Sequence, residues 1–167
     1  MPRLVTRKEI MLWLDTTPSQ VSKNYALYGK KSTSATYSYD ADTTEETYIT
    51  DDNATVTVNS YNVSIDGNMK CYYGDAIYDM INEMRYNLAT GDDAKTYALL
   101  VDKYDVTNNS FKAQEFEATI SIESYGGDGG EIPTITFNIG LNGNPTNGTA
   151  TINSSGEVTF TPAAVSL

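Results

Sequence analysis

The chain has 167 residues, which fits one domain over 1–167 with a core that needs neither disulfides nor a metal. Its 22 acidic residues outnumber 11 basic ones, for a formal net charge of −11, and such a surface argues against sequence-specific nucleic-acid binding. The absence of histidine excludes Ser-His-Asp and Cys-His catalysis and the usual zinc sites.

The first residues are basic, in contrast to the rest of the chain. Arg3, Arg7 and Lys8 occur among the first eight residues, with no acid between them. This N-terminal arm (1–8) is either a solvated tail or a segment that docks on an acidic neighbour. The apolar run 10–14 that follows ends at a turn signal and indicates a buried strand, too short for a secretory signal or a membrane span.

A long acidic stretch follows two further strands, expected at 25–28 and 35–39. Residues 40–53 contain six Asp or Glu residues and no Lys or Arg. Only Tyr48 and Ile49 could anchor this stretch, so we expect a long exposed loop or a hairpin tip, of the kind that is functional or disordered.

The alternation of apolar residues changes phase in the next strand. Ala54, Val56 and Val58 share one parity, whereas Tyr61 and the apolar residues after it take the other. Because side chains alternate with period two, this change predicts a bulge or bend near 59–60. Asp-Gly at 66–67 is a hairpin turn signal, so a short strand is expected to return over 69–73.

One helix is expected at about 75–89. Asp75 is suited to the N-cap, Arg85 to the C-terminal half, and Gly91 to the stop. Five apolar residues at helical spacing form a stripe that should face the core. They are Ile77, Met80, Ile81, Met84 and Leu88.

The remainder is typical of β structure. Apolar residues cluster at 96–101 and alternate with polar ones around 120–122, 134–141 and 158–160. Asn-Gly pairs at 142–143 and 147–148 are expected to be turns. The pattern predicts a mainly β fold, a sandwich or barrel of about eight or nine strands with one flanking helix, and a C-terminal arm at about 160–167.

No motif indicates catalysis, a cofactor or a metal. The glycine-rich segment 126–130 lacks the Lys-Ser/Thr of a phosphate-binding loop. Residues 105–116 begin like a calcium loop, but Ser110 stands where that loop needs glycine and Phe116 where it needs glutamate. We therefore expect a protein that is not an enzyme and that holds no cofactor.

Four motifs occur in order along the chain and, with their spacing, cover roughly residues 8–150. The motifs are Tyr73-Gly74-Asp75 with Ile77, Ile81 and Arg85; Thr90-Gly91-Asp92 before the strand 97–102; Glu123-Ser124-Tyr125-Gly126-Gly127-Asp128; and Asn142-Gly143-Asn144 leading to Gly148-Thr149. Together they resemble the major tail tube protein of long-tailed bacteriophages.

The resemblance implies the tail tube fold, which is shared with the inner tube of type VI secretion systems. It implies hexameric rings whose inner strands form a continuous β-barrel, and rings that stack into a hollow conduit for genome ejection. The implied partners are further copies, a tape-measure protein, and tail terminator and distal tail proteins. Double-stranded DNA would pass without specific binding. The location would be the virion tail, assembled in the bacterial cytoplasm and not on a membrane.

Charge suggests how the rings would meet, because head-to-tail stacking requires two different matching surfaces. We expect inter-ring contacts between the basic arm and the acidic stretch. These residues are Arg3, Arg7, Lys8, Asp42, Glu45, Glu46, Tyr48, Ile49, Asp51 and Asp52. Strands that mix Thr, Ser and Glu with apolar residues are expected to face the lumen. These residues are Thr36, Ser38, Glu117, Thr119, Ser121 and Glu123.

A second function is open at this point. Surfaces rich in Tyr and Asn also suit a β-sandwich module that decorates a virion or binds a carbohydrate or receptor. The two functions differ in polymerisation, since a tube protein forms rings or tubes and a binding module stays a monomer or a closed trimer.

Overall fold

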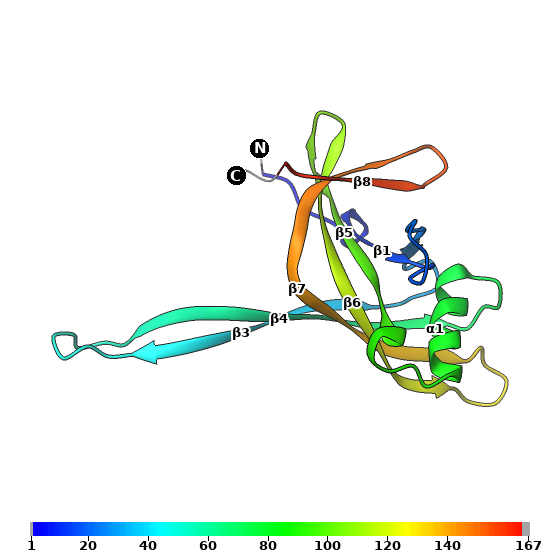
Figure 1. Cartoon of the computed structure of the whole chain (residues 1–167), viewed down its shortest axis with the longest axis horizontal. Coiled ribbons are helices and arrows are strands. Elements are labelled where there is room, and N and C mark those ends of the chain that lie inside the picture. The colour runs from blue at the N-terminus through cyan, green and yellow to red at the C-terminus, as the bar shows by residue number, and fades with distance from the viewer. Residues whose placement is uncertain (1, 165–167) are drawn as a thin grey trace.

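The computed structural model describes residues 2–164, which form one eight-stranded antiparallel sheet with one α-helix beside it (Figure 1). The strand order is β2-β1-β5-β6-β7-β4-β3, and β8 pairs with β7. The elements are η1 (Arg7–Glu9), β1 (Ile10–Asp15), β2 (Tyr25–Tyr28), β3 (Ala35–Glu46), β4 (Thr55–Lys70), α1 (Ala76–Tyr86), η2 (Gly91–Ala94), β5 (Lys95–Thr107), β6 (Ser110–Gly126), β7 (Thr134–Ile152) and β8 (Val158–Pro162).

The sheet curls without closing, so the chain by itself is not the barrel that was one of the two expected forms. Consecutive residues of β1 point to opposite faces, and both faces are covered. Leu12 and Leu14 belong to a larger core shared with α1, whereas Trp13 belongs to a smaller core with Leu99 and Val101. The two faces of the one sheet therefore border two separate cores, whereas the two sheets of a sandwich enclose a single core.

Strand β7 explains why the expected turns at 142–143 and 147–148 are wrong. It pairs with β6 along most of its length, with β4 over residues 134–141 and with β8 over 148–152. Gly143 has a φ of 64°, a conformation that glycine adopts without cost and that bends the strand between its two partners. The Asn-Gly pairs thus mark an irregularity within one strand and not hairpin turns.

The turn expected at 66–67 is also wrong, because β4 runs through it without a break. Gly67 pairs with Ala35 on one side and Phe137 on the other. A Cβ there would lie 2.9 Å from the Phe137 ring and 2.9 Å from the Tyr28 hydroxyl. Glycine is needed at this position for space, not for a turn.

Replacing Gly67 with Ala is expected to lower the free energy of unfolding by about 1–3 kcal/mol, the usual cost of overpacking. The Tyr28 hydroxyl cannot move away easily, since it donates to the Asn68 carbonyl at 2.6 Å and accepts from the Asn68 N–H at 2.9 Å. Chemical denaturation measures the loss. Gly140→Ala is the matched control, because a Cβ there meets only the Thr119 carbonyl at 3.8 Å, and it should leave stability unchanged or slightly raised.

Helix α1 covers the larger core, as its apolar stripe predicts. The Asp75 side chain accepts hydrogen bonds from the N–H groups of Ile77 and Tyr78 and caps the N-terminus. Ile77, Ile81 and Met84 are buried, and Met80 is half-buried against the core.

The C-terminal end of this helix differs from the expectation. Leu88 was expected on the stripe, but the helix ends at Tyr86, Leu88 adopts a φ of 49°, and its side chain is 82 % exposed. A chain that turns left-handed after its last helical turn carries the next side chain away from the helical face. Within residues 2–164, no helix is long and apolar enough to cross a membrane.

The two arms expected from the sequence are largely part of the fold. Residues 7–8 lie in η1, and residues 160–162 pair with β7 as part of β8. Residues 165–167 of the expected C-terminal arm lie outside the described residues.

Candidate functional site

The β3–β4 hairpin projects far from the rest of the molecule (Figure 1). Residues 63–70 of β4 also pair with β7, whereas residues 55–62 pair only with β3 within the described chain. The acidic stretch 40–53 is thus not one long loop: it continues β3 to Glu46, and only residues 47–54 form the turn. Its backbone hydrogen bonds go to β4, which holds the acidic residues on a stiff ribbon instead of a free loop.

The bulge predicted near 59–60 is confirmed. Asp42 pairs with Ser60 and Thr43 pairs with Val58, so Asn59 has no pairing partner in β3. The extra residue shifts the alternation of β4 by one. Even-numbered residues before Asn59 therefore face the same side of the hairpin as odd-numbered residues after it.

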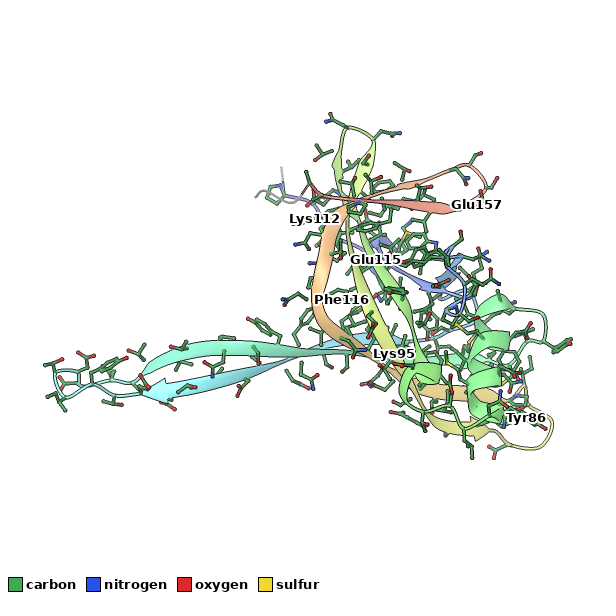
Figure 2. The ribbon with its side chains drawn as sticks, viewed as in Figure 1. Tyr86, Lys95, Lys112, Glu115, Phe116 and Glu157 are labelled. Carbon is green, nitrogen blue, oxygen red and sulfur yellow. The ribbon has the colours of Figure 1, made fainter. Side chains whose placement is uncertain are left out.

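One face of the hairpin is an apolar stripe with nothing packed on it. Residues paired directly across two strands share a face, and the pairs Tyr39–Val63, Ala41–Tyr61, Thr43–Val58 and Glu45–Val56 place the apolar side chains together. The side chains of this hairpin stand clear of the body in Figure 2. We call the exposed members Tyr39, Ala41, Val56, Val58 and Tyr61 the apolar stripe.

The opposite face and the turn carry the acids. Asp40, Asp42 and Glu46 alternate with the stripe residues, and no Lys or Arg occurs between residues 32 and 69. The Asp51 N–H donates to the Tyr48 carbonyl at 2.9 Å, which closes a turn with Ile49 at its corner. Ile49 is fully exposed. The tip (residues 45–52) therefore presents the exposed side chain of Ile49 in an acidic segment.

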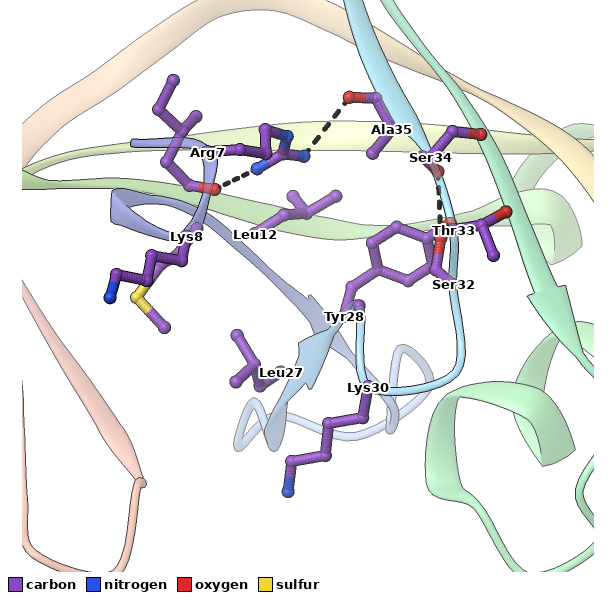
Figure 3. A pocket seen from close by; sticks show the side chains of 13 residues that line it. Arg7, Lys8, Leu12, Leu27, Tyr28, Lys30, Ser32, Thr33, Ser34 and Ala35 are labelled. Atoms are coloured by element: carbon purple, nitrogen blue, oxygen red, sulfur yellow. Dashed lines mark hydrogen bonds between the residues drawn. The ribbon is translucent and has the colours of Figure 1, made fainter. Parts of the chain in front are cut away.

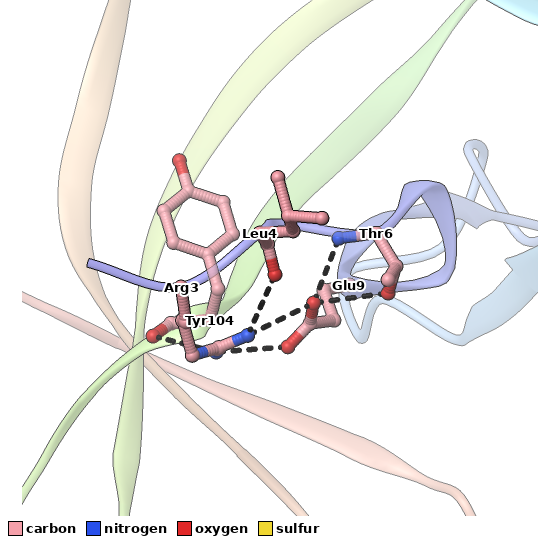
Figure 4. Close-up of polar contacts among 5 residues, drawn as sticks. All are labelled: Arg3, Leu4, Thr6, Glu9 and Tyr104. Carbon is pink, nitrogen blue, oxygen red and sulfur yellow. Dashed lines mark hydrogen bonds and ion pairs between the residues drawn. The ribbon is translucent and has the colours of Figure 1, made fainter. Parts of the chain in front are cut away.

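The N-terminal cations are divided between internal contacts and solvent. Arg3 forms an ion pair with Glu9 at 2.9 Å and donates to the Tyr104 carbonyl (Figure 4). The hydrogen bond from Arg3, together with those from Thr6, lowers the pKa of Glu9 to about 2. The guanidinium of Arg3 therefore has partners within its own chain. Arg3 was expected at an inter-ring contact, where its charge would have to be free for another subunit.

Arg7 and Lys8 line a groove of about 550 Å³ at the base of the hairpin (Figure 3). Arg7 donates to the Ile10 and Ala35 carbonyls and so ties β1 to the start of β3. Lys8 and Lys30 are both exposed at this groove, whose floor includes Met11 and Leu27. Lys30 was not predicted as a site residue from the sequence, because two strands lie between it and the basic arm along the chain.

Four of the residues expected at a lumen lie on one face of the sheet. Pairing across β3, β4, β7 and β6 places Thr36, Asp66, Asn138 and Ser121 in one row. The next row contains Ser38, Ser64, Gly140 and Thr119. Both rows face away from the larger core, because Tyr37, Ile65, Ile120 and Ile139 of the intervening positions face it. We call these two rows the polar sheet face.

Side chains of this face bond to one another across strands. The Asn138 amide donates to Asp66 at 2.7 Å, and the Asn142 amide donates to Thr119 at 2.8 Å. Glu117 lies one row further and pairs with Lys95 at 3.4 Å, which offsets its charge. Glu123 lies where the register of β6 shifts between Ile122 and Ser124, so it belongs to no row.

The side chains on these surfaces are of the kinds that form non-covalent contacts with other molecules. No group of three or more His, Cys, Asp or Glu residues within 2–164 is arranged to hold a metal ion. The polar sheet face offers small hydroxyl and amide groups, and the hairpin offers apolar and acidic side chains. Both arrangements suit surfaces that meet other macromolecules.

Comparison with known proteins gives matches among solved structures alone. No family model and no curated protein matches the chain. A chain from the tail of an empty gene transfer agent particle, refined with C6 symmetry, aligns at a TM-score of 0.58 and 13% identity, covering 86% of this chain and 98% of that one. A chain from the virion of a native gene transfer agent aligns at 0.56 and 10% identity, with the same coverage. The likeness confirms the expected mainly β tail tube fold with one helix.

Proposed function

We propose that this chain is a structural subunit of a bacteriophage tail tube, in which hexameric rings stack into a hollow conduit for DNA. The observation that carries the proposal is a whole-chain likeness to a subunit of an assembled tail, since 98% of that chain is covered. The unpartnered apolar stripe adds to it, because exposed apolar surface of this kind commonly marks a contact with another protein.

Ring formation would use the open edges of the sheet. Strands β2 and β3 are the two ends of the strand order, and each offers unpaired backbone groups on its outer side. Such edges invite pairing with another chain, and a closed ring removes them. The tail chain's C6 symmetry supports six copies as the closed number here.

The polar sheet face would then line the lumen. Its side chains are mostly the small hydroxyl and amide groups of Thr, Ser and Asn, and Asp66, its one charged member, accepts a hydrogen bond from Asn138. A face without cations cannot hold DNA by releasing counterions, so the polymer would move freely past it. Thr36, Ser38, Thr119 and Ser121 are the residues proposed to face the DNA.

Stacking would use the projecting hairpin. The tip acids and the apolar stripe are rigidly displayed beyond the body of the subunit, where another ring would be met. The resemblance to tail tube proteins extends the proposal to a tape-measure protein in the lumen and to terminator and distal proteins at the two ends. The mature location would be the tail of the virion, after assembly in the host cytoplasm.

Electron microscopy of the purified chain tests this function. We expect rings or hollow tubes whose length increases with protein concentration, together with fast-sedimenting species in sedimentation velocity. A monodisperse monomer or closed trimer over the same concentrations would contradict the proposal and favour a receptor-binding or decoration module.

The double variant V56S/V58S is expected to prevent tube growth without unfolding the subunit. It removes the two apolar side chains that the bulge at Asn59 places on the same face as Tyr61. Residues 55–60 are exposed, so the denaturation midpoint should stay within error of the wild type. The control is T55S/T57S, which changes the opposite face of the same strand and should form tubes seen by electron microscopy.

A further inference from the structure

The groove at the base of the hairpin combines positive charge with an apolar floor (Figure 3). Arg7, Lys8 and Lys30 line it, and its described lining includes no Asp or Glu. Met11 and Leu27, both half-buried, also line it and contribute apolar surface. Three cations without a carboxylate stand out in a chain whose net charge is −11.

The hairpin tip has the complementary composition. Ile49 is fully exposed at the corner of its turn, and four exposed acids, Glu45, Glu46, Asp51 and Asp52, lie within four residues of it in the chain. An exposed isoleucine fits an apolar floor, and four carboxylates fit a cationic rim. The groove volume of about 550 Å³ is sufficient for a few side chains but not for a whole strand.

We infer that this groove is the receptor for the hairpin tip of a second copy of the chain, with Lys8 and Lys30 facing the tip carboxylates and Ile49 entering between them. The inference rests on the proposed function and assigns the surface that receives the hairpin. It keeps Arg7 and Lys8 of the expected basic arm as acceptors and adds Lys30 from the segment after β2, whereas Arg3 is paired with Glu9.

The groove cannot receive the tip of its own chain. Ala35, the first residue of β3, lines the groove, and the hairpin extends away from it (Figure 1). From Ala35 to Ile49 a strand at the usual rise spans roughly 45 Å. Only another molecule can place its tip at this base, so the contact is head to tail. A head-to-tail contact uses two different surfaces, and it generates a stack where its rotation does not close into a ring.

The other grooves fit the tip less well. The groove of about 720 Å³ beside α1 is lined by Asp79, Glu83 and Asp93, which would repel the tip. The groove of about 460 Å³ beside β8 has one cation, Lys112. Charge therefore favours the groove at the hairpin base and makes the Lys112 groove the alternative that an experiment must separate.

Charge reversal tests the pairing in the full chain. The variant K8E/K30E and the tip variant E45K/D52K should each raise the concentration needed for tube growth by roughly tenfold or more, because like charges then meet. Combining all four substitutions should restore tubes. The variant K103E/K112E changes the net charge by the same four units at two exposed lysines outside this groove; it is the control for net charge and should behave as wild type. Tubes from K8E/K30E at the wild-type concentration, or no restoration by a folded fourfold variant, would overturn the inference.

Disulfide trapping gives a readout that does not require tubes. In a Cys71→Ala background, T50C with K30C should form covalent dimers and a ladder of higher species on oxidation, whereas T50C with K112C should not. A ladder from the Lys112 pair would assign the tip to the other groove and overturn the inference. Wild-type protein that forms no tubes, together with a Lys30 ladder, would contradict the tube function while supporting the tip–groove contact.

Discussion

A chain in which residues 43–59 are replaced by Asn-Gly is expected to fold like the wild type and to form no tubes. The two-residue turn would join Asp42 to Ser60, which are paired in the structure, and Asn-Gly is the preferred sequence for such a hairpin. Every residue removed is exposed, so no core contact is lost. The variant lacks the tip and the two valines of the apolar stripe, Val56 and Val58.

The expected loss of assembly is large because many weak contacts are removed from every copy. Burying Val56 or Val58 fully would contribute about 1.5–3 kcal/mol each, and an exposed ion pair at the tip only ~0–1 kcal/mol. Circular dichroism and thermal denaturation would check the fold, and electron microscopy the tubes. Normal tubes from this shortened chain would show that the hairpin has no part in stacking.

Phe137→Ala is expected to lower the free energy of unfolding by about 3–5 kcal/mol, the usual cost of removing a buried phenylalanine. The ring is fully buried in the larger core, lies over Gly67, and meets Tyr28 edge to face with centroids 5.9 Å apart. Its loss leaves a cavity where β4, β2 and β7 meet. Urea denaturation measures the change.

Phe160→Ala is the matched control for this substitution. Phe160 lies on β8 beside the smaller core and is half-buried, so its removal should cost well under the loss at Phe137. Equal losses at the two positions would mean that the larger core does not dominate the stability of the sheet.

The strands and the helix start could be predicted from local pattern because their causes are local. A continuous apolar run before a turn signal predicted the strand 10–14, alternation predicted the strand 35–39, and the Asp75 cap predicted the start of α1. The glycine-containing pairs were misread for a non-local reason. Gly67 is required by the Phe137 ring, 70 residues away, and Gly143 by the change of pairing partner from β4 to β8. Nothing in the neighbouring sequence distinguishes these glycines from turn glycines.

The candidate surfaces could be predicted in part. The acidic stretch and the change of parity at Asn59 were both visible in the sequence, and together they define the two-faced hairpin. The groove could not be found in this way, because it brings Lys30 next to Lys8 by packing β1 against β2. The partner of Arg3 within the chain could not be predicted for the same kind of reason, since Glu9 becomes its partner only when η1 forms.

Helical reconstruction of tubes by electron cryomicroscopy tests the central claim most directly. The account predicts sixfold rings, the polar sheet face toward the lumen, and each hairpin tip in the Lys8–Lys30 groove of the next ring. The ring-to-ring rise should not exceed the reach of the hairpin, roughly 45 Å. A rise well beyond that length, or hairpins that project freely from the outside of the tube, would contradict it.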